Sequence, residues 1–410
     1  MGQSQMPSAV TYDSPFVIQD QPGENGRVLY AFVRGEDGHL YRNFWSGKEW
    51  NWVDHGSPQN IGVSSAPSAI STTQWWGRLQ NAGSVIDVFA RANDLNLYRM
   101  TGDGDYWEWD PLGQPQAPLT GKPAATEYWR LLDGELRDAT ALIYVFGRDV
   151  DGELQLSFFD GNIWAWFLHG FPSEHVSVAD DPGVAVYDFG GRRKLYTFVT
   201  GSDGHLHVHI GDGANKRDGD GMNWEWADQN LPSQDNRGPG TQTVAGTPAA
   251  TVWTPNRPNA ELVQGDTMLL AFVRGTDGHL YRNYWNGQTW VWFDHQMPQN
   301  SDTHQNTSVG DPAVALYEYN GLLRPYVFVR GDDGHLYSNT WNGQNWVWFD
   351  HQTPQNSATH QNTDVGDPSV ASYTHDGYPT LYVFARGRDG NLYASYWDGQ
   401  KWQWRDQNSH

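Results

Sequence analysis

The chain contains no cysteine among its 410 residues, which excludes disulfide bonds, thiolate nucleophiles and thiolate metal ligands. Charged residues make up only 18% of the chain, with 26 Lys and Arg and 48 Asp and Glu. The resulting formal net charge of −22 repels phosphate backbones and anionic lipids. We therefore expect neither nucleic acid nor a membrane surface as a partner.

Long apolar runs are missing as well. No segment approaches the roughly 20 apolar residues that a membrane-spanning helix requires, so membrane insertion is not expected. The first ten residues, MGQSQMPSAV, lack the basic and apolar regions of a signal peptide. We expect a soluble protein, released or secreted by a route that uses no signal peptide.

Ligand spacing for a metal is not evident among the 15 histidines. The pair His295 and His304, like the pair His351 and His360, is nine residues apart in loops rich in Asn and Gln. Histidines exposed on loops explain this pattern without a metal. We expect no metal and no cofactor.

Aromatic residues are abundant, with 22 Trp, 20 Tyr and 16 Phe, and they belong to a repeat. Residues 269–298, LLAFVRGTDGHLYRNYWNGQTWVWFDHQMP, return with few changes at 28–58, 324–354 and 380–407, and in weaker form three more times. The residue aligned with the Arg of VRG recurs at steps of 57, 57, 52, 74, 56 and 56, as Arg34, Arg91, Arg148, Thr200, Arg274, Arg330 and Arg386. Seven units therefore fill the chain.

Each unit predicts four short antiparallel strands. Asp-Gly and Asn-Gly separate runs of β-branched and aromatic residues, and these dipeptides favour tight hairpins. A lead-in strand opens each unit, beginning at Pro7 in the first one. Four strands per repeat of this length are typical of a propeller blade, and well-kept first and last units favour a closed ring over a linear solenoid.

We thus predict an all-β fold, a seven-bladed β-propeller that forms one domain over residues 1–410. The order of the four strands from the axis outward stays open. The repeat units are approximately 7–60, 67–115, 122–172, 182–232, 247–298, 311–354 and 367–408.

Strand alternation places Tyr281, Asn283 and Trp285 on one side of a blade, with Leu280 and Tyr284 on the other. The second Trp of the W-x-W pair is present in all seven units, so we assign it to packing between blades. The Trp of the W-x-G turn differs, because only units one, five, six and seven keep it. We expect a residue that is kept in only some of the units to bind a ligand.

The motif FVRGxDGHLYxNxWxGxxWxWxDH resembles the PLL-type lectins of Photorhabdus along nearly the whole chain. That resemblance implies a released, homo-oligomeric, seven-bladed lectin. It also implies shallow pockets between neighbouring blades for fucose and related, often O-methylated, sugars, without metal or catalytic groups. Units two to four depart from the motif, which leaves the number of pockets open.

A sugar ring has an apolar face and a rim of hydroxyls, so its pocket needs an aromatic wall and a few fixed polar groups. We expect Arg, the His after the Asp-Gly turn and the Asp-His loop to meet at one rim, and sugar to bind between units five and six, six and seven, or seven and one. A structural ion pair is the alternative for the arginines. The predicted sugar-binding residues are Trp45, Trp285, Trp341, Trp397, Tyr41, Tyr281, Tyr337, Tyr393, Asn43, Asn283, Asn339, Arg34, Arg274, Arg330, Arg386, His39, His279 and His335.

Repetition of one pocket suits a multivalent lectin that recognises glycans on a surface, such as host glycans met by a bacterial protein, because several weak sites add avidity. A sialidase-like glycoside hydrolase is one alternative, but it would need unlike residues, such as paired carboxylates, meeting at one sugar. A protein-interaction scaffold is another, and its faces would differ from blade to blade. The sequence favours a lectin and no enzyme activity.

Overall fold

The computed structural model describes residues 15–20, 28–72, 85–103, 106–113, 115–129, 131–132, 135–136, 142–213, 219–232, 240–255, 267–375 and 378–408. Nearly all regular structure in these residues is β-strand, with one short 3-10 helix, Pro58–Asn60. No helix within these ranges has the length and apolar character to cross a membrane.

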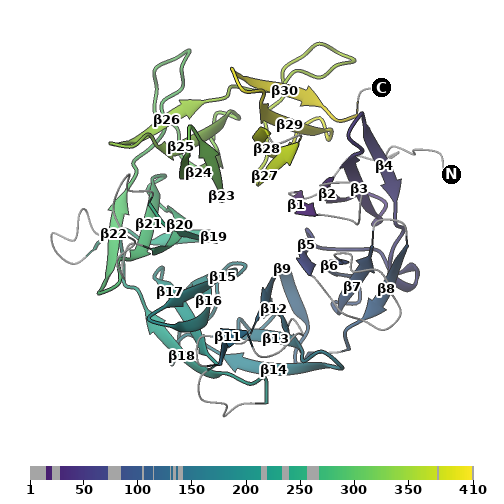
Figure 1. Cartoon of the computed structure of the whole chain (residues 1–410), viewed down its shortest axis with the longest axis vertical. Coiled ribbons are helices and arrows are strands. Elements are labelled where there is room, and N and C mark those ends of the chain that lie inside the picture. The colour runs from purple at the N-terminus through teal and green to yellow at the C-terminus, as the bar shows by residue number, and fades with distance from the viewer. Residues whose placement is uncertain are drawn as a thin grey trace.

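The strands form seven antiparallel four-stranded sheets around a central axis, which confirms the seven-bladed β-propeller (Figure 1). Blades one to three comprise β1 (Phe16–Asp20), β2 (Val28–Arg34), β3 (Leu40–Trp45), β4 (Trp50–Asp54); β5 (Ser68–Thr72), β6 (Val85–Arg91), β7 (Leu97–Gly102), β8 (Trp107–Pro111); and β9 (Leu119–Tyr128), β12 (Leu142–Asp149), β13 (Leu154–Phe159), β14 (Trp164–Gly170). A small hairpin, β10 (Leu131–Leu132) and β11 (Glu135–Leu136), precedes β12.

Blades four to seven repeat the arrangement without an added hairpin in their described residues. They comprise β15 (Gly183–Phe189), β16 (Arg192–Thr200), β17 (Leu206–Asp212), β18 (Asn223–Asp228); β19 (Val244–Trp253), β20 (Met268–Gly275), β21 (Leu280–Trp285), β22 (Trp290–Asp294); β23 (Ala313–Tyr319), β24 (Leu322–Arg330), β25 (Leu336–Trp341), β26 (Trp346–Asp350); and β27 (Ser369–His375), β28 (Tyr378–Arg386), β29 (Leu392–Trp397), β30 (Trp402–Asp406).

The lead-in strand of each unit is the innermost one, which the sequence left open (Figure 1). Each inner strand contacts the inner strands of both neighbouring blades, and β27 contacts β1, so the ring closes. At this seam the Val17 backbone N–H donates to the Ser369 hydroxyl over 3.1 Å. The inner strand of blade one follows Pro15, whereas the predicted lead-in from Pro7 lies outside the described residues.

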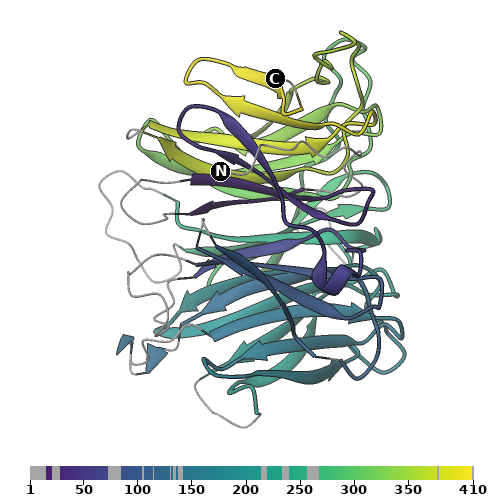
Figure 2. The same ribbon diagram turned by 90° about the vertical axis from the view of Figure 1, so that its right-hand side faces the viewer.

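The strands run between two faces of the ring (Figure 2). Because successive strands are antiparallel, the Asp-Gly turns and the links between blades share one face, here called the connection face. The W-x-G turns lie on the opposite face, here called the tryptophan face. Both predicted hairpin turns form around left-handed glycines, with φ of 86° at Gly278 and 93° at Gly287. A Cβ added at Gly278 would also collide with Ser308.

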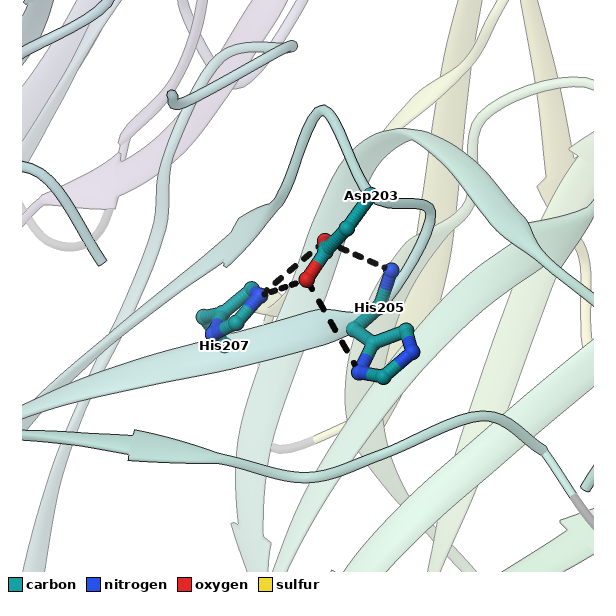
Figure 3. Close-up of side chains that lie close together, drawn as sticks. All are labelled: Asp203, His205 and His207. Carbon is teal, nitrogen blue, oxygen red and sulfur yellow. Dashed lines mark hydrogen bonds and ion pairs between the residues drawn. The ribbon is translucent and has the colours of Figure 1, made fainter. Parts of the chain in front are cut away.

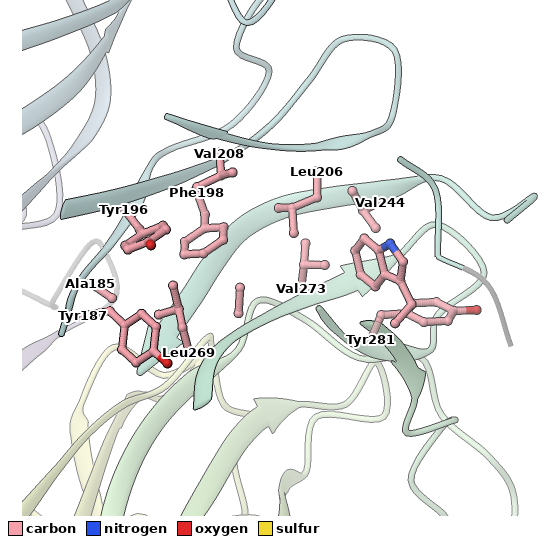
Figure 4. Close-up of a cluster of buried hydrophobic side chains, with 12 residues drawn as sticks. Ala185, Tyr187, Tyr196, Phe198, Leu206, Val208, Val244, Leu269, Val273 and Tyr281 are labelled. Atoms are coloured by element: carbon pink, nitrogen blue, oxygen red, sulfur yellow. The ribbon is translucent and has the colours of Figure 1, made fainter. Parts of the chain in front are cut away.

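Apolar clusters fill the gaps between blades. In the gap between blades four and five, Phe198, Leu206 and Val208 pack with Leu269 and Val273 (Figure 4). The same cluster includes Tyr281 and Trp292, while Leu280 and Tyr284 pack with blade six, so the predicted alternation is confirmed. Blade five therefore turns its Tyr-Asn-Trp side toward blade four.

One hydrogen bond recurs in every gap. The indole N–H of the second Trp of each W-x-W pair donates to a backbone carbonyl at the end of the preceding blade, over 2.8–3.1 Å. The seven bonds run from Trp52 to Gln407, Trp109 to His55, Trp166 to Leu112, Trp226 to His169, Trp292 to Gln229, Trp348 to His295 and Trp404 to His351. These seven hydrogen bonds, here called the indole circuit, link every blade to the preceding one. They explain why the second Trp of the W-x-W pair is present in all seven blades.

Candidate functional site

The predicted sugar-binding residues are spread over both faces of the ring. His279 precedes β21 at the connection face, and Trp285 ends the same strand at the tryptophan face. A six-residue strand is about 20 Å long, so these two side chains do not share one rim. The same separation holds for His39 and Trp45 and for His335 and Trp341.

The predicted tyrosines are buried and form part of the Asp-Gly turns. Each hydroxyl donates to the carboxylate four residues earlier over 2.6–2.7 Å, in the pairs Tyr41 and Asp37, Tyr281 and Asp277, Tyr337 and Asp333, and Tyr393 and Asp389. Burial and the accepting carboxylate raise the pKa of Tyr281. Each of these four hydroxyls is therefore engaged within its own blade.

Two of the predicted arginines form ion pairs with the next blade. Arg274 Nε donates to Asp311 Oδ1 over 2.9 Å, and Arg330 Nε lies 3.4 Å from Asp367 Oδ1. Asp311 and Asp367 line the central channel at the start of β23 and β27. Arg34 and Arg386 end β2 and β28 at the same position of the repeat. For Arg274 and Arg330 the geometry is that of the structural ion pair named as the alternative.

The predicted histidines pair with the Asp of the Asp-His loop. His279 Nδ1 lies 3.0 Å from Asp294, and the same pairing joins His39 to Asp54 and His335 to Asp350 at 3.0 Å. Their expected closeness to this loop is therefore confirmed.

The His of the Asp-His loop takes a different direction and enters the gap toward the next blade. The ring of His351 lies 4.5 Å from that of Trp402, and its Nε2 is 2.9 Å from the Ser338 hydroxyl. Burial lowers the pKa of His351 to about 3.

Because His351 is buried and its pKa is lowered, we expect the fold to lose stability in acid. The unfolded chain binds a proton at this residue below about pH 6.5, whereas the folded chain does so only near pH 3, so stability falls as the pH falls through this window. Between pH 7 and pH 5 the wild type should lose about 2 kcal/mol more unfolding free energy than His351→Gln. Gln is compatible with the fold because Gln407 occupies the equivalent position in blade seven.

Urea denaturation at the two pH values measures this difference. His175→Gln is the matched control, because its side chain is 90% exposed and should follow the wild type. Parallel curves for His351→Gln and the wild type would contradict the assignment.

The W-x-G tryptophans form pairs that the sequence analysis missed. Trp285 lies opposite Trp290 across the hairpin, with ring centroids 5.7 Å apart and planes inclined at 56°. The equivalent pairs in blades one, six and seven have centroids 5.7–6.1 Å apart and planes inclined at 52–59°, and they are Trp45 and Trp50, Trp341 and Trp346, and Trp397 and Trp402. The W-x-G-x-x-W spacing carried this signal, because residues opposite each other in a hairpin share a face.

Each Trp pair is half-buried and faces the preceding blade. Trp285 meets Phe189 at 6.2 Å and Trp290 meets Tyr196 at 6.4 Å, both from blade four. Trp397 likewise meets Tyr319 of blade six. The pairs therefore lie in the gaps between blades seven and one, four and five, five and six, and six and seven. The gap between blades four and five was not among those expected from the sequence.

This gap contains a groove of about 700 Å³, here called the 4/5 groove. Its lining residues are His205, Ala227, Asp228, Gln229, Asn230, Leu231, Gly240, Asn283, Trp285, Gln288, Thr289, Trp290 and Trp292. The groove thus combines an indole wall with amide, hydroxyl and carboxylate groups.

Asn283 adds an unsatisfied amide to this wall. Its side chain is fully buried, and neither amide atom has a hydrogen-bond partner among the described residues. Asn43 is equivalent in blade one and is in the same state, while Asn339 retains an unpaired carbonyl oxygen within the same described ranges. A buried amide without partners costs free energy that a ligand hydroxyl or a water could recover.

No protein-family model and no curated protein matches this chain. Among solved structures, it is similar to the BP39L lectin from Burkholderia pseudomallei, with 18% identity and a TM-score of 0.60 over 97% of this chain and 99% of that one. It is also similar to a fucose-specific lectin from Aleuria aurantia, with 16% identity and a TM-score of 0.51 over 83% of this chain and 96% of that one. This protein therefore has the fold of propeller proteins that are lectins.

Proposed function

We propose that the protein is a multivalent carbohydrate-binding lectin that holds one sugar ring in each of four gaps between blades. The Trp pair carries this proposal, because it recurs in blades one, five, six and seven with nearly constant geometry. A C–H face of a pyranose packs on indole, and hydroxyls need fixed polar partners such as the Asn283 amide. The four sites use the indoles of the W-x-G turns together with Asn43, Asn283 and Asn339 where these are present.

Fucose, free or O-methylated, is the sugar class to which we assign these sites. The PLL-like motif supports this choice, and the Aleuria protein of similar fold is described as fucose-specific. We propose binding without chemical conversion, since the repeated acids Asp37, Asp277 and Asp333 accept hydrogen bonds from tyrosines within their own turns.

Calorimetric titration with methyl α-L-fucoside tests the proposal. We expect weak binding at up to four sites per chain, and sugar density in soaked crystals beside Trp45, Trp285, Trp341 and Trp397. A panel of fluorogenic glycosides should release no product above the buffer rate. A glycan array without any binding would instead favour the interaction scaffold, and product release would favour the hydrolase.

A further inference from the structure

Blade four carries a cluster of side chains that its sister blades lack. Its Asp-Gly turn is followed by His205 and His207, two residues apart on one face of the strand. Both imidazoles approach the carboxylate of Asp203 (Figure 3). Asp203 Oδ2 lies 3.1 Å from His207 Nε2 and 3.8 Å from His205 Nδ1.

The repeat shows what is unusual here. The position of His207 is occupied by Tyr41, Tyr98, Gln155, Tyr281, Tyr337 and Tyr393 in the other blades. Each of the five tyrosines donates to the Asp four residues earlier in its own turn, as His207 can do with Asp203. Gln155 instead donates to Asp149, six residues earlier. Blade four keeps the Asp of the turn, but at the position where the other blades have a hydroxyl or an amide it has a second imidazole, that of His207.

A second carboxylate lies beside the cluster. Asp228, at the end of β18, places Oδ2 3.0 Å from His205 Nδ1. In a tetrahedral zinc site with ligands about 2.0–2.1 Å from the metal, neighbouring ligand atoms are about 3.3 Å apart. The two distances from Asp203 to the imidazoles, 3.1 and 3.8 Å, are near that value, and the ligand atoms of Asp203, His205 and His207 all lie within 4.8 Å of one another.

We propose that Asp203, His205 and His207 form a binding site for a divalent transition-metal ion of the zinc class, with Asp228 beside His205. Two imidazoles with one carboxylate suit such an ion, and the surplus of negative charge favours cations near the surface. His207 is 2% exposed and anchors the site, while Asp203 and His205 are 28% and 27% exposed and leave it open to solvent. This site departs from the sequence-based expectation of no metal, which found no ligand spacing among the 15 histidines.

Calorimetric titration of the full, EDTA-treated chain with Zn²⁺ in sugar-free buffer tests this proposal. We expect one strong site per chain. His207→Tyr and His205→Asn should each weaken it at least 100-fold, since each removes a ligand. Both substitutions copy sister blades, where Tyr281 and Asn391 occupy these positions, so the variants should keep the wild-type circular dichroism and thermal midpoint.

A gain-of-site variant provides the converse test. Tyr281→His would give blade five the same set, because Asp277, His279 and Asp294 are already in place. We expect the stoichiometry to rise from one to two zinc ions per chain. Absence of strong binding in the wild type, or equal affinity in the wild type and both loss variants, would overturn the proposal. His205 and Asp228 also line the 4/5 groove, and titration without sugar tests the metal site separately from the sugar sites.

Discussion

Trp52→Ala should lower the free energy of unfolding by about 3–5 kcal/mol, the usual effect of truncating a large buried aromatic side chain. Trp52 is 3% exposed, and its indole N–H donates to the Gln407 carbonyl over 2.9 Å. Trp52→Phe keeps most of the packing but leaves that carbonyl unpaired, so its cost should be smaller, about 1–3 kcal/mol. Equilibrium urea denaturation measures both effects.

The control for Trp52 is Tyr106→Ala, because Tyr106 is 63% exposed and its loss should change stability by less than about 0.5 kcal/mol. Trp348→Ala offers a second comparison. It removes the equivalent hydrogen bond between blades five and six, which the polypeptide chain also connects. Should Trp52→Ala unfold at the wild-type urea concentration, the indole circuit would have no part in closing the ring.

The triple variant Trp285→Ala, Trp341→Ala, Trp397→Ala should lose agglutination of fucosylated cells or beads while still binding free sugar. Only the pair of Trp45 and Trp50 then remains complete. We expect the number of sugars bound per chain to fall from four to one. Agglutination should fall at least about 100-fold, because avidity needs several sites on one rigid body.

A matched variant separates loss of the pocket from loss of the fold. Blade three has Phe159 at the position of the turn Trp, and its ring lies 5.0 Å from Trp164, so the blade tolerates Phe there. The triple Trp→Phe variant should keep the wild-type thermal midpoint and bind sugar more weakly. If the triple Ala variant is folded and still agglutinates, the Trp pairs are not the sugar sites.

Much of the fold was accessible from the sequence because its determinants are local or repeated. Turn glycines such as Gly278 set the hairpins, and alternation along β21 placed Tyr281 and Trp285 on one face. The constancy of Trp52 and its six equivalents indicated packing between blades, which the indole hydrogen bonds confirm.

The site was less accessible because its geometry depends on contacts between blades. Sequence spacing does not say which neighbour a blade face meets, so the gap between blades four and five was overlooked. It also does not reveal that Tyr281 already donates to Asp277, or that Arg274 pairs with Asp311 in the next blade. The partners in the last pair lie 37 residues apart and meet only after the ring has formed.

The seam between blades seven and one has the same inner-strand contact and the same indole hydrogen bond as the other six gaps. No covalent link between the described strands crosses it, so the geometry of this interface does not require chain continuity. The order of the blades along the polypeptide is then only one of seven equivalent ways to thread the same ring. A circular permutant opened between β26 and β27 and joined across the present seam should assemble the same propeller.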